Sequence, residues 1–98
     1  NGVRPLFFGR KDQKIYAFAS ESVALDYLGY SEIQEVLPGE AIIIPAGAEP
    51  ERRMLFQKSY SPCMFEWVYF ARVESLMGGK SVYQARFDLG LILAEEIK

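Results

Sequence analysis

The most apolar and aromatic stretch of the chain lies at residues 61–86, SPCMFEWVYFARVESLMGGKSVYQAR, and it ends in a well-marked helix start. Short β-rich runs separated by turn signals precede it, and a single amphipathic pattern follows it. Period-two and turn-rich sequence favours strands, whereas apolar residues spaced three and four apart favour a helix. We therefore expect short strands before this stretch and one long helix after it.

Composition excludes several classes of site. The 98 residues contain no histidine, which excludes His-based catalytic triads and imidazole metal ligands within them. The net charge is −2 with interspersed signs, so nucleic acid is not an expected partner. No apolar run approaches the roughly 20 residues that span a bilayer, and the single cysteine agrees with a reducing compartment. We expect a soluble, cytoplasmic protein without a membrane partner and, since no methionine opens it, a piece of a longer polypeptide.

Turn residues and β-rich runs divide the first 60 residues. Pro38-Gly39 suits a type II turn, and the serines at 20 and 22 can cap a following helix. We expect the isolated piece to expose its apolar strands at 4–9 and 41–44 as open edges. The predicted elements are a strand at 4–9, a polar loop at 10–14, a strand at 15–19, a two-turn helix at 23–29, a half-exposed strand at 32–36, a buried strand at 41–44, a polar loop at 45–53 and a short strand at 54–56.

Residues 63–70 can be a strand or a helix. Aromatic and β-branched content favours a strand. The pair Ser61-Pro62 favours a helix, with Ser as the cap and Pro at the first helical position, and we prefer the helix. Further on, Gly78-Gly79 predicts a tight turn, and the S-x-x-Q capping box at 81–84 opens a helix that runs to about Glu96. Its expected apolar stripe is Val82, Ala85, Leu89, Ile92 and Leu93.

Few side chains in this sequence could carry chemistry. Glu66, inside the aromatic run, could act as a general acid, but an ion pair with Arg4, Arg72 or Arg86 is the favoured interpretation. Glu21 and Asp26 are too loosely spaced for a metal site, and we expect them to be solvated. Cys63 has no histidine partner, so we favour a buried, unreactive thiol.

Five segments of the chain are distinctive: RPLFFG (4–9), YAFASESVALDYLGY (16–30), VLPGEAIII (36–44), PCMFEWVYFAR (62–72) and SVYQAR (81–86). Together they resemble glutamine phosphoribosylpyrophosphate amidotransferases, the amidophosphoribosyltransferases. The family usually has Pro-Asp-Ser after its FAR motif, whereas this chain has Val73-Glu74-Ser75. FEWVYFAR followed by SVYQAR is specific to this family, and the earlier motifs are shared more loosely with other amino-terminal-nucleophile glutaminases.

The resemblance implies an α+β fold at the junction of two domains. Residues 1–60 would be the C-terminal part of an αββα amino-terminal-nucleophile (Ntn) glutaminase sandwich, with antiparallel strands and one short helix. Residues 61–80 would be the interdomain crossing, and residues 81–98 the first helix of an α/β phosphoribosyltransferase domain. Trp67, Tyr69 and Tyr83 would be candidates for contacts that sense closure between the domains.

The resemblance also implies a function for the full-length protein. Such an enzyme forms 5-phosphoribosylamine from phosphoribosylpyrophosphate and glutamine-derived ammonia, the first step of purine synthesis, and is expected to be a homo-oligomer. The alternative is a non-catalytic scaffold or regulatory module that keeps only this junction. No catalytic or cofactor-binding residue is carried over, because the family's nucleophilic cysteine and its Asp-Asp and Thr loop for Mg²⁺ and phosphoribosylpyrophosphate have no counterpart here. We expect the 98 residues alone to be inactive.

The resemblance leaves two roles open for Cys63. In some family members the cysteine at this place is one ligand of a [4Fe–4S] cluster, whereas other members keep it without a cluster. One thiolate cannot hold a cluster that needs four, so residues 1–98 should bind no iron by themselves. Cys63 is therefore a candidate metal ligand in the full-length protein, and a plain buried thiol is the favoured interpretation.

Overall fold

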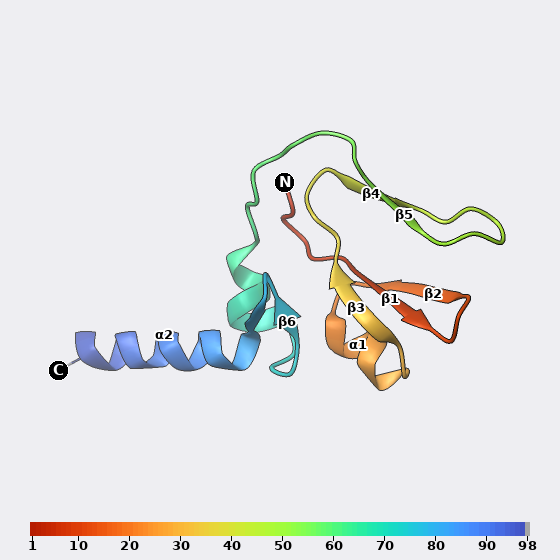
Figure 1. Cartoon of the computed structure of the whole chain (residues 1–98). Coiled ribbons are helices and arrows are strands. Elements are labelled where there is room, and N and C mark those ends of the chain that lie inside the picture. The colour runs from red at the N-terminus through yellow and green to blue at the C-terminus, as the bar shows by residue number, and fades with distance from the viewer. Residues whose placement is uncertain (98) are drawn as a thin grey trace.

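The computed structural model describes residues 1–97, and they form an elongated α+β molecule of 60 × 31 × 16 Å. Figure 1 shows a strand-rich part and the long helix α2 at opposite ends, joined by one helical turn and a small hairpin. The expected order of strands first and helix last is therefore observed. The elements are β1 (Phe7–Lys11), β2 (Ile15–Ala19), α1 (Ser22–Tyr27), β3 (Ser31–Glu35), β4 (Glu40–Ile43), β5 (Glu51–Met54), η1 (Glu66–Phe70), β6 (Leu76–Met77), β7 (Lys80–Ser81) and α2 (Val82–Glu96).

A three-stranded antiparallel sheet in the order β2-β1-β3 packs against α1 (Figure 1). Alternate residues of β1 face the helix, so Phe7 is 4% exposed and joins Leu25 of α1 in the core. The prediction of an open edge strand at 4–9 is wrong, because β1 is the central strand and begins only at Phe7. Pro5 has no N–H to donate to a ladder, which explains the later start.

The opposite face of this sheet carries aromatic side chains. Phe8 stacks on Tyr16 with ring centroids 5.7 Å apart and lies 5.2 Å from Phe18, its direct partner across the strands. These cross-strand pairs stabilise the β1–β2 register. Phe18 is nevertheless 46% exposed, so this face is only partly covered within residues 1–97.

The hairpin β4–β5 projects away from the sheet and has its own register, in which Glu40 pairs with Met54 (Figure 1). Gly39 precedes it with φ +81°, and a Cβ there would lie 1.9 Å from the carbonyl oxygen of Phe56. In the observed register β5 spans Glu51–Met54, so the predicted strand at 54–56 was placed too late. The predicted burial of the other strand is also wrong: no residue of β4 is buried, because no second layer covers it in the described chain.

Residues 64–70 are helical, which confirms the preferred interpretation of this aromatic run. The last part, η1, is a π-helical turn closed by a hydrogen bond of 2.9 Å from the Ala71 N–H to the Glu66 carbonyl. The predicted cap at Ser61-Pro62 is not used. The N–H of Ser61 donates instead to the carbonyl of Asn1, so the chain stays extended there and the helix begins after Cys63.

Helix α2 begins and ends close to the predicted positions. Ser81 is its N-cap, and the Ser81 Oγ accepts a hydrogen bond of 3.4 Å from the backbone N–H of Gln84. The reciprocal half of the capping box is absent, because the Gln84 amide donates to Asp88 at 2.8 Å instead. The predicted apolar stripe is present, but only Val82 is buried, whereas Leu89 and Ile92 are 48% and 60% exposed.

Candidate functional site

Residues 61–80, which we call the crossing segment, join the strand-rich part to α2. Their buried apolar side chains belong to the same core as those of the sheet and α1. Ala71 and Met77 pack in one cluster with Phe7, Leu25 and Val82. The crossing segment is therefore docked on the strand-rich part, and it also supports the first residue of α2.

Glu21 binds the crossing segment through its carboxylate. One oxygen, Oε2, accepts hydrogen bonds from the backbone N–H of Arg72 at 2.7 Å and from the Ser75 hydroxyl at 3.1 Å. Ser75 is completely buried. The expectation that Glu21 is merely solvated is thus wrong, whereas Asp26 is exposed as expected. The partners of Glu21 lie more than 50 residues away, beyond what local spacing indicates.

Ser22 extends this contact by one residue. Its hydroxyl accepts a hydrogen bond of 2.9 Å from the Leu76 N–H and lies 3.4 Å from the Leu76 carbonyl, to which it donates. The residue therefore satisfies both backbone groups of Leu76 as a neighbouring strand would. The prediction of a serine cap on α1 is wrong, because Glu21 occupies the N-cap position and neither serine hydroxyl caps the helix.

Glu35, at the end of β3, holds the tip of the β6–β7 hairpin. Its Oε2 accepts a hydrogen bond of 2.8 Å from the N–H of Gly78, and its Oε1 accepts one of 3.3 Å from the Tyr60 hydroxyl. Burial, together with the neighbouring carboxylate, raises the pKa of the Tyr60 phenol. The Gly78-Gly79 turn forms as predicted, with positive φ at both glycines.

Glu66 is ion-paired, as we predicted from the sequence. Its Oε1 lies 2.5 Å from Nε of Arg4, and the Glu66 side chain is 7% exposed. The other two candidate partners are used differently. Arg86 donates to the backbone carbonyls of Trp67 at 2.7 Å and Ala71 at 2.8 Å, while Arg72 contributes its backbone N–H to Glu21.

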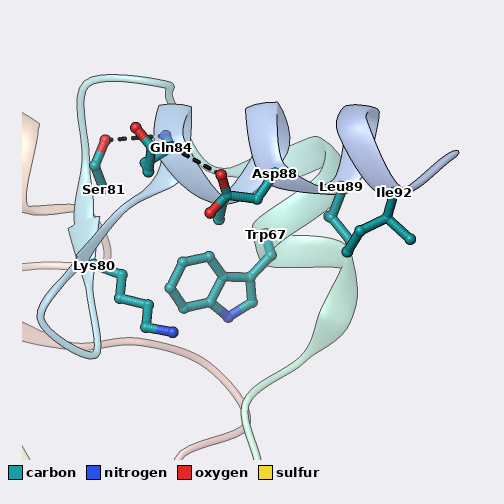
Figure 2. Close-up of a pocket in the computed structure, with 8 residues that line it drawn as sticks. Trp67, Lys80, Ser81, Gln84, Asp88, Leu89 and Ile92 are labelled. Carbon is teal, nitrogen blue, oxygen red and sulfur yellow. Dashed lines mark hydrogen bonds between the residues drawn. The ribbon is translucent and has the colours of Figure 1, made fainter. Parts of the chain in front are cut away.

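A groove of about 780 Å³ lies between η1 and α2 (Figure 2). In Figure 2 the Trp67 ring lies beneath the first turns of α2, beside the Lys80 side chain, and Leu89 and Ile92 extend from the same side of the helix. The groove thus combines an aromatic ring and aliphatic side chains with a few polar groups. Its lining residues are Trp67, Lys80, Ser81, Gln84, Ala85, Asp88, Leu89 and Ile92.

The candidate metal ligand Cys63 is a half-buried free thiol, rather than the fully buried one expected. Its backbone N–H donates to the carbonyl of Val3 at 3.0 Å. Within residues 1–97, no three Cys, Asp or Glu side chains lie together as a metal site requires. None of the helices in this part of the chain is long and apolar enough to cross a membrane.

Known proteins match the chain along its whole length, although no protein-family model does. It is 44% identical over 106 residues to the amidophosphoribosyltransferase of Lachancea kluyveri and 45% identical over 102 residues to that of Escherichia coli. These alignments cover 100% and 99% of this chain, but 21% and 20% of the relatives. The chain matches a segment of the amidophosphoribosyltransferases.

The fold agrees with the same family. A solved glutamine phosphoribosylpyrophosphate amidotransferase from B. subtilis, in complex with ADP and GMP, superposes with a TM-score of 0.86 and 37% identity. That match covers 98% of this chain and 21% of the solved one, so the chain spans about a fifth of the amidophosphoribosyltransferases that it matches. The resemblance found in the sequence motifs, and the α+β fold that it implied, are confirmed.

Sequence reasoning missed three residues that hold the crossing segment: Glu21, Ser22 and Glu35. The first two lie within the matched motif YAFASESVALDYLGY, which was the only available signal. Their roles are not visible in local patterning, because each side chain binds backbone groups that are 40 or more residues away.

Proposed function

We propose that the chain is the junction segment of an amidophosphoribosyltransferase. The full-length protein would form 5-phosphoribosylamine from phosphoribosylpyrophosphate and glutamine-derived ammonia, the first step of purine synthesis. The observation that carries the proposal is the match along the whole chain in both sequence and fold, at 44–45% identity and a TM-score of 0.86. The segment itself would contribute structure rather than catalytic groups.

We assign residues 1–60 to the end of the glutaminase domain, 61–80 to the interdomain crossing and 81–98 to the first helix of the phosphoribosyltransferase domain. Two observations support this division. The crossing segment is held by polar side chains of the strand-rich part, and α2 leaves Leu89 and Ile92 uncovered along its groove. A helix with an exposed apolar stripe is expected to bury it against further protein, here the rest of the second domain.

Substrate chemistry would lie outside these residues. The sequence has neither a threonine nor an Asp-Asp pair, so it offers no loop of the family's kind for phosphoribosylpyrophosphate and Mg²⁺. Its single cysteine is interior to the chain, so it is not the amino-terminal nucleophile of a glutaminase. The Mg²⁺ ion and both substrates would therefore be bound by other parts of a homo-oligomeric, cytoplasmic enzyme.

Cys63 stays a candidate ligand for a [4Fe–4S] cluster in the full-length protein. Residues 1–97 can supply at most this one thiolate, and a cluster needs four ligands. A half-buried position agrees with either role. Iron and sulfide analysis of anaerobically purified full-length protein decides between them: four irons per chain, lost in Cys63→Ser, would establish the ligand, and iron-free protein would establish the plain thiol.

The test of the proposed function is pyrophosphate release from phosphoribosylpyrophosphate by the purified full-length protein, with glutamine or ammonium as the nitrogen donor. We expect both donors to support the reaction, and residues 1–98 alone to support neither. Full-length protein that folds but releases no pyrophosphate with either donor would instead favour the alternative, a non-catalytic scaffold that retains this junction.

A further inference from the structure

The first turn of α2 is attached to the first turn of α1 through one short turn of the crossing segment, residues 72–76. Glu21 accepts hydrogen bonds from the Arg72 N–H and the Ser75 hydroxyl, and Ser22 pairs with the backbone of Leu76. All of these bonds reach residues 72–76 from the N-terminal end of one helix.

The same turn carries the start of α2. The carbonyl of Val73 accepts a hydrogen bond of 3.1 Å from the Tyr83 N–H, and the carbonyl of Ser75 accepts one of 3.0 Å from the Val82 N–H. The first N–H groups of a helix have no partner inside the helix, so these two carbonyls fix where α2 begins and how it is directed. A rotation of residues 72–76 would therefore also change the direction of α2.

The Glu21 carboxylate forms the strongest hydrogen bonds among these contacts. Hydrogen bonds to a charged acceptor are shorter and stronger than those between neutral groups, and the 2.7 Å bond from the Arg72 N–H is of that kind. The apolar contacts of the turn are few, since Arg72, Val73 and Glu74 are exposed. The hydroxyl of the buried Ser75 has Glu21 as its only side-chain partner in the described chain.

We propose that Glu21 is a positioning residue, which sets the direction of α2, and hence of the domain that α2 opens, relative to the strand-rich part. The proposal rests on the two-domain function above. In such an enzyme ammonia must pass between two centres, and small misplacement of reacting partners is costly. Loss of the Glu21 carboxylate would loosen the turn, so glutamine hydrolysis would continue while less of the ammonia reaches the second centre.

The first test is hydrogen exchange in the full-length protein without substrates, so it does not depend on the proposed function. In Glu21→Ala, we expect peptides containing residues 72–76 and the start of α2 to exchange about tenfold faster than in the wild type. Glu21→Gln keeps an acceptor oxygen and should change exchange much less. Ser75→Ala removes one of the two hydrogen bonds to Glu21, so its exchange rate should lie between those of the two Glu21 variants. It replaces Glu21→Ala in this test if Glu21→Ala does not fold. Asp26→Ala on the same helix is the control.

The second test is the ratio of glutamate formed to pyrophosphate released, measured well below the unfolding temperature. The wild type should form equal amounts, and Glu21→Ala about twofold or more excess glutamate, with Glu21→Gln restoring the ratio. A purely structural role would lower both products together and leave the ratio unchanged, which would overturn the proposal, as would unchanged exchange at residues 72–76. An inactive wild type would refute the proposed function, while the exchange data would still decide the role of Glu21.

Discussion

Arg86, one turn into α2, donates a hydrogen bond of 2.7 Å from its Nε to the carbonyl oxygen of Trp67 in η1. Its Nη2 also donates to the carbonyl of Ala71 at 2.8 Å, so the guanidinium binds two carbonyls that the π-helical turn leaves free at its C-terminal end. The last turn of a helix leaves carbonyls without partners, and Arg86 satisfies two of them. The long helix and η1 are therefore held together by these two hydrogen bonds.

Replacing Arg86 should weaken this junction. Arg86→Met leaves two half-buried carbonyls without a donor, and we expect a loss of about 1–3 kcal/mol in the free energy of unfolding. Arg86→Lys should recover only part of it, because an ammonium cannot reproduce the planar fork. Denaturant unfolding of the full-length protein measures both. Arg72→Met is the matched control, since the Arg72 side chain is exposed and makes no hydrogen bond within residues 1–97; an equal loss there would contradict the assigned role.

The free energy of unfolding should depend on the ion pair between Arg4 and the buried carboxylate of Glu66. Arg4→Met removes the only ion-pair partner of Glu66 in the described chain, and the desolvated charge should cost about 1–3 kcal/mol of unfolding free energy. Glu66→Gln should cost less, because the amide is neutral and can still accept a hydrogen bond. A double-mutant cycle isolates the interaction, and additive losses of the two variants would show that the pair is not coupled.

Acid should destabilise the hairpin β4–β5, because it protonates Glu40. The Arg52 guanidinium, which hydrogen-bonds both carboxylate oxygens at 2.7 Å, holds the pKa of the Glu40 carboxyl below its ordinary value. When the pKa of a carboxyl is lower in the folded state than in the unfolded state, the ionised carboxyl stabilises the fold. This stabilisation is complete at pH values above the unfolded-state pKa, and it is lost as the pH falls through the folded-state pKa. The melting-temperature difference between wild type and Arg52→Met should therefore be constant above about pH 5 and shrink below pH 4.5.

Arg53→Met is the control for that measurement. Arg53 pairs with Glu51, two residues away, and both side chains are more than half exposed. Exposed pairs of this kind contribute about 0–1 kcal/mol, so this variant should show little pH dependence. A shrinking difference of the same size in Arg53→Met would mean that general charge, rather than the Glu40–Arg52 pair, governs the acid response.

Some of this architecture was predictable because its causes are local. Pro38-Gly39, Gly78-Gly79 and the Ser81 cap each act within four residues, and the structure has all three features. Features that depend on distant contacts were missed. Phe7 is buried because its face of the central strand β1 packs against α1, and the hydrogen bonds of Glu21 depend on a turn that begins 51 residues later. The family resemblance was visible because whole motifs, rather than single residues, match.

Trp67, Tyr69 and Tyr83 stay candidates for contacts between the domains. Tyr69 and Tyr83 are 75% and 61% exposed, and Trp67 lines the groove, so all three are available to a second domain. If the proposed function holds and hydroxyl contacts transmit closure, phosphoribosylpyrophosphate should stimulate glutamine hydrolysis by the full-length protein, and Tyr69→Phe and Tyr83→Phe should reduce that stimulation. Unchanged stimulation in both variants would assign these rings to packing alone.

The central claim is that residues 1–98 perform the role of the junction in an amidophosphoribosyltransferase. The most direct measurement replaces the matching segment of the E. coli enzyme, which is 45% identical, with this chain and determines glutamine-dependent pyrophosphate release. We predict a folded chimera that uses both glutamine and ammonium, with a rate within about tenfold of the parent, because the segment holds no reacting group and keeps the fold. A chimera that folds and assembles like the parent, yet releases no pyrophosphate with either donor, would contradict the claim.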